Sequence, residues 1–176
     1  MQPSKVLSKF NAVLDTWERA LNDYSETDFL KKHADDAWSI GQVYNHLIGA
    51  TNRFHLTQVE TCLKNMENAH QSKKMPGRVT YFLGSIPPIK VKVPPSPEYT
   101  PPQPKDMATV KTNLQALRPK MAEMAAVLSE KQGKTGKTAH PAFGFLDAFE
   151  WFQMVEIHFR HHLRQKERLD KFLKSA

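Results

Sequence analysis

The chain has 176 residues, of which 40% are apolar and 24% are charged, a composition typical of one globular domain with its own core. No run of about 18 apolar residues occurs and the first residues lack a secretory pattern, so we expect a cytoplasmic protein without a membrane-spanning helix. The net charge of +7 comes from scattered lysines and arginines without a nucleic-acid motif, which indicates a solvated basic surface and no nucleic-acid partner.

The first half of the chain carries two stretches in which apolar residues recur at helical spacing. The first spans about residues 4–24, with an apolar stripe that runs from Val6 to Tyr24. The second spans about residues 39–68, and Ser39 is its expected N-terminal cap. Each stripe predicts one helix that packs its apolar face against the rest of the fold.

The second half carries two further helical patterns. The third covers about residues 106–131 and contains Pro119, where we expect a kink because proline lacks a backbone donor and clashes with the preceding turn. The fourth runs from about Phe145 to Leu173 and is rich in aromatic residues. Together the patterns predict an all-α fold, a single four-helix bundle domain over residues 1–176.

The connection between the second and third helices differs in composition, because residues 70–105 hold most of the 12 prolines. A high density of prolines favours extended backbone. Two segments of the link, VTYFL (79–83) and IKVKV (89–93), can each form a short strand or lie against the bundle. A link of this length also allows helices two and three to be parallel. The shorter linker, residues 132–141, contains GKTGKT, which lacks the spacing of a phosphate loop and is interpreted as a flexible basic loop.

Three histidines occupy inward positions of the predicted helices. His158 and His162 lie four residues apart on the apolar face of the fourth helix, so both rings can point at one metal ion. A hydrogen-bonded pair of core histidines explains the same spacing equally well. His46 lies on the inward face of the second helix, where a lone histidine is most often an ordinary core residue. His161 is expected to point towards the rim of the bundle.

Several segments resemble one known family. WSIGQVYNHL, residues 38–47, resembles the start of helix two in the DinB-like superfamily, which includes the YfiT-like proteins. HFRHHLRQ, residues 158–165, resembles the last helix of that family, and KTAHPAFGFL, residues 137–146, resembles the lead-in to that helix in one subgroup. The order of the elements is also similar, including the long link, so the resemblance covers nearly the whole chain.

The resemblance implies an up-down-down-up four-helix bundle with a long Pro-rich connection between helices 2 and 3, commonly paired into a homodimer. It also implies that His46, His158 and His162 bind one divalent metal ion, with zinc and nickel as the expected metals. Characterised relatives transfer low-molecular-weight thiols such as bacillithiol, or isomerise substrates with mycothiol or glutathione. Our first hypothesis is therefore a metal-dependent thiol transferase that acts on a small-molecule substrate.

Other functions fit the same residues. Three neutral imidazoles leave a bound ion at least one open position, where a thiol is deprotonated or a water is activated for hydrolysis. A metal-dependent hydrolase, a non-enzymatic metal- or ligand-binding stress-response bundle and a structural dimer with empty histidines are the alternatives. The sequence marks no catalytic residue and no general base.

Two glutamines lie close in sequence to the proposed ligands. Gln42 is one turn before His46, and Gln165 is three residues after His162. Metal-bound imidazoles usually donate their other N–H to a partner, and both glutamines are candidates for that role. An ordinary polar position on a helix explains each of them equally well.

Three further residues receive structural interpretations. Trp38 is expected to anchor the start of the second helix, and His140, followed by proline, to fix the turn into the last helix. Cys62 is the only cysteine, which excludes an intramolecular disulfide and an all-cysteine metal site. We interpret Cys62 as a core residue and not as a nucleophile.

Overall fold

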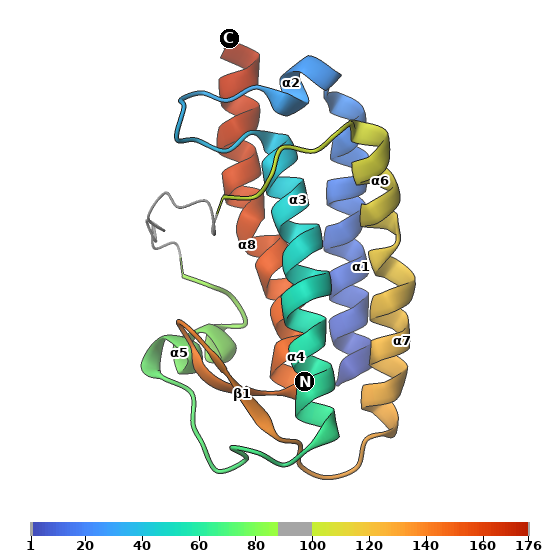
Figure 1. Cartoon of the computed structure of the whole chain (residues 1–176), viewed down its shortest axis with the longest axis vertical. Coiled ribbons are helices and arrows are strands. Elements are labelled where there is room, and N and C mark those ends of the chain that lie inside the picture. Colours follow the sequence, from blue (N-terminus) through green and yellow to red (C-terminus); the bar gives the residue numbers. More distant parts are fainter. Residues whose placement is uncertain (1, 88–99, 176) are drawn as a thin grey trace.

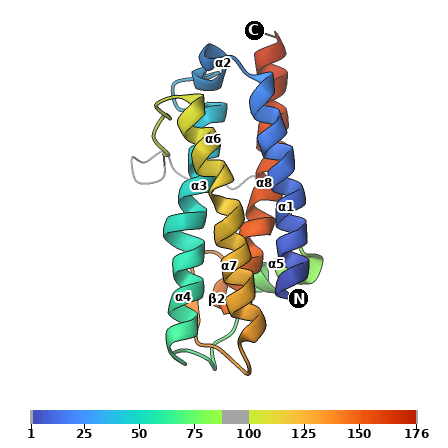
Figure 2. The ribbon, with the colours of Figure 1, turned by 90° about the vertical axis from the view of Figure 1, so that its right-hand side faces the viewer.

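The computed structural model describes residues 2–87 and 100–175, and the chain is mostly helical with one small two-stranded sheet. Its long helices lie side by side as parallel columns (Figures 1 and 2). The columns are α1 (Pro3–Ala20), α3 (Ile40–Ala50) continued by η2 (Thr51–His55) and α4 (Leu56–Lys64), α6 (Met107–Gln115) with α7 (Leu117–Glu130), and α8 (Ala148–Ser175).

The columns run in two directions around a shared core. In Figure 1, α1 and α8 run upwards, whereas α3–α4 and α6–α7 run downwards. The indole Nε1 of Trp17 donates to the carbonyl of Phe159 at 3.2 Å, and the Tyr44 hydroxyl donates to the carbonyl of Trp17 at 2.8 Å. These bonds join α1, α8 and α3 through buried side chains. Within the two described ranges, no helix combines the length and apolarity needed to cross a bilayer.

Local sequence signals explain where the helices begin. Ser39 Oγ accepts the backbone N–H of Gln42 at 3.1 Å, and Gln42 Oε1 accepts the backbone N–H of Ser39 at 3.0 Å. This reciprocal capping box confirms the predicted cap of α3. The short helices η1 (Leu21–Asp23) and α2 (Glu26–Leu30) connect α1 to this cap.

The second predicted helix is shorter and less regular than its apolar pattern indicated. It ends at Lys64 instead of near residue 68, and a π-helical turn, Thr51–His55, separates α3 from α4. Thr51 Oγ1 donates to the carbonyl of Leu47 at 2.8 Å and therefore competes for an acceptor of the last turn of α3. The π-helical turn changes the direction in which every later side chain of this column points.

The predicted interruption of the third helix is present, but it lies before the proline. α6 ends at Gln115 and α7 begins at Leu117, so that Pro119 is the third residue of α7. Because Pro119 has no N–H for the carbonyl of Gln115, the hydrogen-bond ladder breaks one turn before the proline itself.

The expectation of extended backbone throughout the Pro-rich link is wrong for its first part. Residues 79–83 lie in the helix α5 (Met75–Leu83), not in a strand. Pro76 stands in the first turn, where no backbone donor is required, and Gly84 ends the helix with φ +62°. The possible strand at 89–93 lies outside the described residues.

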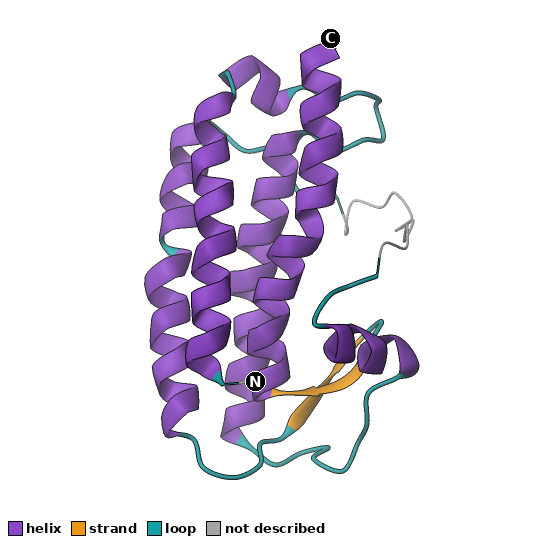
Figure 3. Ribbon diagram, turned by 180° about the vertical axis from the view of Figure 1, so that it is seen from behind, coloured by secondary structure: helices purple, strands orange, loops and turns teal. Residues whose placement is uncertain are grey.

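The shorter linker also contains structure that the sequence did not reveal. β1 (Lys137–His140) and β2 (Gly144–Asp147) form an antiparallel hairpin in which Lys137 pairs with Asp147 (Figure 3). The last helix therefore begins at Ala148, not at Phe145. Asp147 and Glu150 cap it reciprocally, with backbone-to-carboxylate bonds of 2.9 and 3.1 Å.

The end of the Pro-rich link packs against α3. The carbonyls of Pro101 and Pro102 accept from the side-chain amides of Gln42 and Asn45 at 2.6 and 3.0 Å. A Cβ atom on Gly41 would lie 2.7 Å from the Cγ of the buried Pro104. The link can approach the helix this closely because residue 41 has no side chain.

Candidate metal centre

Three histidines from two columns converge inside the bundle. Nε2 of His158, on α8, lies 3.0 Å from Nε2 of His46, on α3, and 3.0 Å from Nε2 of His162, one turn further along α8. All three ligand atoms lie within 4.8 Å of one another. Nitrogens that bind one zinc ion at about 2.0–2.1 Å lie at separations of this order.

The protein holds these imidazoles in their neutral, ligand-competent form. Burial, with a smaller effect of His161, lowers the pKa of His46 to about 4, and burial together with His46 lowers the pKa of His162 to about 3. Burial also holds the pKa of His158 well below its usual range. At neutral pH the rings therefore present unprotonated nitrogens to an ion.

A match to a family model accompanies this geometry. The model of the DinB superfamily matches residues 9–165, which is most of the chain. The chain belongs to the DinB superfamily. No curated protein and no solved structure matches it. The three histidines selected by their helical positions and by the resemblance are therefore brought together in a member of this superfamily, and their chemistry fits a divalent cation.

One of the two glutamines contacts a histidine of this DinB-superfamily site. Nδ1 of His162 donates to Oε1 of Gln165 at 2.8 Å, which leaves the lone pair of His162 on Nε2, the atom that faces the other two rings. Gln42 instead uses its side chain for the cap of α3 and for Pro101, so the interpretation as a partner of His46 is wrong. A capping box fixes its side chain at the start of the helix.

Aromatic rings surround the three histidines. The ring of Trp38, half-buried just before α3, lies 5.2 Å from the ring of His46, so the expected anchor also packs on a proposed ligand. His161 lies 5.2 Å from His162 and is half-buried, but it does not join the group of ligand atoms. His161 thus lies at the edge of the site, as its helical position predicted.

Sequence reasoning missed His55. Its side chain is only 4% exposed, and its ring lies 5.1 Å from the ring of His158. In an uninterrupted helix, the nine positions between His46 and His55 equal two and a half turns, which places the two residues on opposite sides. The π-helical turn, which the sequence pattern does not mark, rotates His55 away from that opposite side, and its ring packs against His158.

The remaining singled-out residues have structural roles. Nδ1 of His140 accepts the backbone N–H groups of Ala142 and Phe143 at 3.1 and 3.3 Å. His140 therefore fixes a turn, as predicted, but it is the turn of the hairpin, and β2 lies between it and α8. Cys62 is 1% exposed and burial raises its pKa, so the interpretation as a core residue is confirmed.

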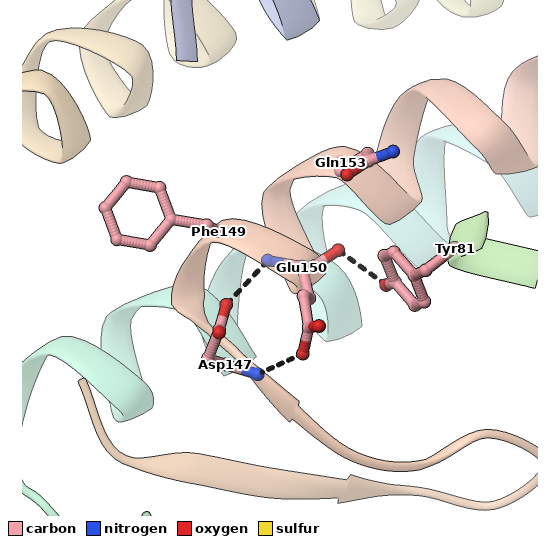
Figure 4. A pocket seen from close by; sticks show the side chains of 5 residues that line it. All are labelled: Tyr81, Asp147, Phe149, Glu150 and Gln153. Carbon is pink, nitrogen blue, oxygen red and sulfur yellow. Dashed lines mark hydrogen bonds between the residues drawn. The ribbon is translucent and has the colours of Figure 1, made fainter. Parts of the chain in front are cut away.

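Two hollows of the surface are large enough for small molecules. One, of about 500 Å³, is lined by His46 together with residues of α3, Pro101, Pro102 and Asn113 of α6. The other, of about 420 Å³, lies at the start of α8 (Figure 4). There Asp147 and Glu150 are engaged in the helix cap and Tyr81 donates to the Glu150 carbonyl at 2.7 Å, so its polar groups serve the fold. Only the first hollow reaches the three-histidine cluster.

Proposed function

We propose that the protein binds one divalent metal ion through Nε2 of His46, His158 and His162. The observation that carries this proposal is the 3.0 Å approach of His158 Nε2 to both other nitrogens. Nε2 of His162 is an acceptor, because its Nδ1 carries the proton that Gln165 accepts. Even if Nε2 of His158 carried a proton, it could donate to only one of its two neighbours, so an acceptor nitrogen stays unsatisfied in this partly buried site unless a cation binds.

We propose further that a low-molecular-weight thiol uses the remaining position, so that the protein acts as a metal-dependent transferase. A divalent ion bound there would stabilise the thiolate form of that thiol. In the transfer, the sulfur forms a bond to an electrophilic carbon, the leaving group departs with the bonding electrons, and the thiol proton goes to solvent. His46 forms part of the wall of the 500 Å³ hollow, where we place the small-molecule substrate.

The ligand set favours transfer to a thiolate over hydrolysis. No carboxylate belongs to the group of ligand atoms within the described residues, and Glu156, on α8, is paired with Arg160 at 2.7 Å. Hydrolysis generally uses a base beside the activated water, whereas a thiolate is already a nucleophile. The metal-dependent hydrolase and the non-enzymatic stress-response bundle remain the second and third candidates.

The superfamily resemblance supports several finer proposals. Zinc and nickel are the proposed metals, since imidazole nitrogens suit both. We propose that the columns form the up-down-down-up bundle of the superfamily, with the Pro-rich link joining helices two and three, and that the protein is a cytoplasmic homodimer.

Metal analysis of the purified protein tests the first step. We expect about one equivalent of zinc or nickel per chain, in keeping with a single three-histidine site. Protein that stays metal-free after incubation with either ion, and that shows no saturable binding by calorimetry, would contradict the metal proposal.

A thiol-consumption assay tests the second step. Metal-loaded protein is mixed with bacillithiol, glutathione or coenzyme A and a panel of electrophiles, and the loss of thiol is followed over time. We expect turnover with at least one thiol and none in protein treated with a chelator. Metal-loaded protein without turnover for any thiol would favour the non-enzymatic alternative.

A further inference from the structure

His55 is an inward-facing histidine that the proposed ligand set does not use. It ends the π-helical turn between α3 and α4, and its ring meets that of His158 edge-on, with an interplanar angle of 83° and a centroid separation of 5.1 Å. π-Helical turns inside α-helices occur frequently at functional sites. Here the turn brings a fourth imidazole against a proposed metal ligand.

Polar ring atoms of His55, His158 and the neighbouring Trp151 lack hydrogen-bond partners in the described residues. Among the residues that the structure describes, Nδ1 of His55, Nδ1 of His158 and Nε1 of Trp151 are buried and unpartnered. The Trp151 ring lies 6.1 Å from the His55 ring, so the three side chains form one contiguous group. A buried polar atom without a partner costs free energy, which makes three neighbouring examples inside one core unusual.

Metal binding would fix which nitrogen of His158 carries its proton. If His158 binds an ion through Nε2, its proton must be on Nδ1, and that N–H needs an acceptor. For His162 the corresponding acceptor is Gln165. His158 has no equivalent partner in the described part of the chain, and His55 packs against it in addition to the two other proposed ligands.

We propose that His55 is the positioning residue of the metal centre, accepting the Nδ1–H of His158 through one bridging water. This inference rests on the proposed metal site and adds a residue to it. Nδ1 of His55 accepts from that water, and the unpartnered Nε1–H of the neighbouring Trp151 is a second possible donor to it. His55 thereby holds the ring of His158 with its Nε2 directed at the ion.

Two substitutions at residue 55 separate this hydrogen bond from simple packing. His55→Phe keeps a ring but removes the acceptor, whereas His55→Gln keeps an acceptor oxygen. Loss of an outer partner typically weakens metal binding by about 10–100-fold, which we expect for His55→Phe in cobalt and zinc titrations. We expect His55→Gln to stay much closer to the wild type. Phe54→Leu is the packing control, because the Phe54 ring contacts the rings of His55 and Trp151 but carries no polar atom.

Two spectroscopic readouts report on geometry instead of stability. The visible absorption bands of bound cobalt should change in His55→Phe and be restored in His55→Gln. In the zinc-loaded wild type, nitrogen-15 NMR should show His158 protonated on Nδ1 with slow solvent exchange. A rapidly exchanging His158 proton, or equal zinc affinity in the wild type and a folded His55→Phe protein, would overturn the inference.

The outcomes distinguish the two levels of the proposal. Wild-type protein that binds neither cobalt nor zinc counts against the metal site itself and removes the basis of this role for His55. Wild-type protein that binds the ions, together with unchanged spectra and affinity in His55→Phe, leaves the metal site standing and refutes only the role of His55. Circular dichroism of each variant establishes that the helices are intact.

Discussion

Nε2 of His46 lies 3.0 Å from Nε2 of His158, although the two positions differ by 112 in the sequence. One atom belongs to α3 and the other to α8, so the site exists only when these columns are packed together. Metal binding and folding should therefore be coupled, because the unfolded chain does not hold the nitrogens at this separation.

Removal of one proposed ligand should abolish tight metal binding. Nε2 of His158 lies 3.0 Å from Nε2 of both other histidines. For His158→Ala we therefore expect zinc affinity to fall by more than the roughly 100-fold that the loss of a ligand's hydrogen-bond partner can cause. His46→Ala should behave in the same way. Isothermal titration with zinc, together with metal analysis of the purified variants, measures the effect.

His70→Ala is the control for these variants, since His70 is exposed and does not belong to the ligand group. It should bind zinc like the wild type. Equal zinc stoichiometry and affinity in His158→Ala and His70→Ala would show that the ion, if bound, uses other residues.

Added metal should stabilise the folded protein. A ligand that binds only the native state adds about 2.7 kcal/mol at a free concentration 100 times its dissociation constant. We expect a higher midpoint of thermal unfolding with zinc than with a chelator in wild-type protein, and no such difference in His46→Ala. A zinc-dependent shift of equal size in both proteins would contradict coupling through His46.

The main helices and the pair of His158 and His162 were predictable because each depends on short-range patterns. The stripe of α1 repeats at helical spacing, and the spacing of His158 and His162 places both on one face of α8. The cap at Ser39 is equally local. The meeting of His46 with His158 was not a consequence of spacing; the superfamily resemblance supplied it.

The features that were missed depend on backbone details or on tertiary contacts. The π-helical turn that ends at His55 changes the side of the helix on which His55 lies, whereas the prediction assumed 3.6 residues per turn throughout. α5 was mistaken for extended backbone because proline content outweighed the position of Pro76, which lies in the first turn of the helix. Each strand of the hairpin has only four residues, too few for the alternation of apolar and polar residues to be recognised.

The metal-free protein should lose stability as the medium becomes mildly acidic. The folded pKa values of His46 and His162 are about 4 and about 3, below the ordinary value of 6.5. The unfolded chain therefore binds more protons between these values, so stability is fully present above about pH 6.5 and falls as the pH decreases towards 4 and 3. Each proton bound only by the unfolded chain lowers the free energy of unfolding by at most about 1.4 kcal/mol per pH unit of acidification.

Urea unfolding in the presence of a chelator, at several pH values between about 5 and 7.5, measures this slope while carboxylates remain ionised. His46→Gln should have a shallower pH dependence than the wild type, because it removes one of the protons. A wild-type stability that is constant or rises on acidification over this range would show that the rings are protonated in the folded state.

The close approach of the Pro-rich link to α3 makes Gly41 sensitive to substitution. In Gly41→Ala the new Cβ would lie 2.7 Å from Pro104 Cγ and 2.9 Å from the backbone carbonyl oxygen of Phe29, and the latter cannot rotate away. Forced overpacking of this kind typically costs about 1–3 kcal/mol, which urea unfolding measures.

Gly49→Ala is the matched control on the same helix. Its Cβ would approach only the guanidinium end of Arg53, an exposed and flexible side chain that can move aside. Because alanine favours a helix interior by roughly 0.5–1 kcal/mol over glycine, this variant should be as stable as the wild type or more stable. If Gly41→Ala proved as stable as Gly49→Ala, the link would not be held against α3 in solution, and the wall that Pro101 and Pro102 give to the hollow beside His46 would have to be revised.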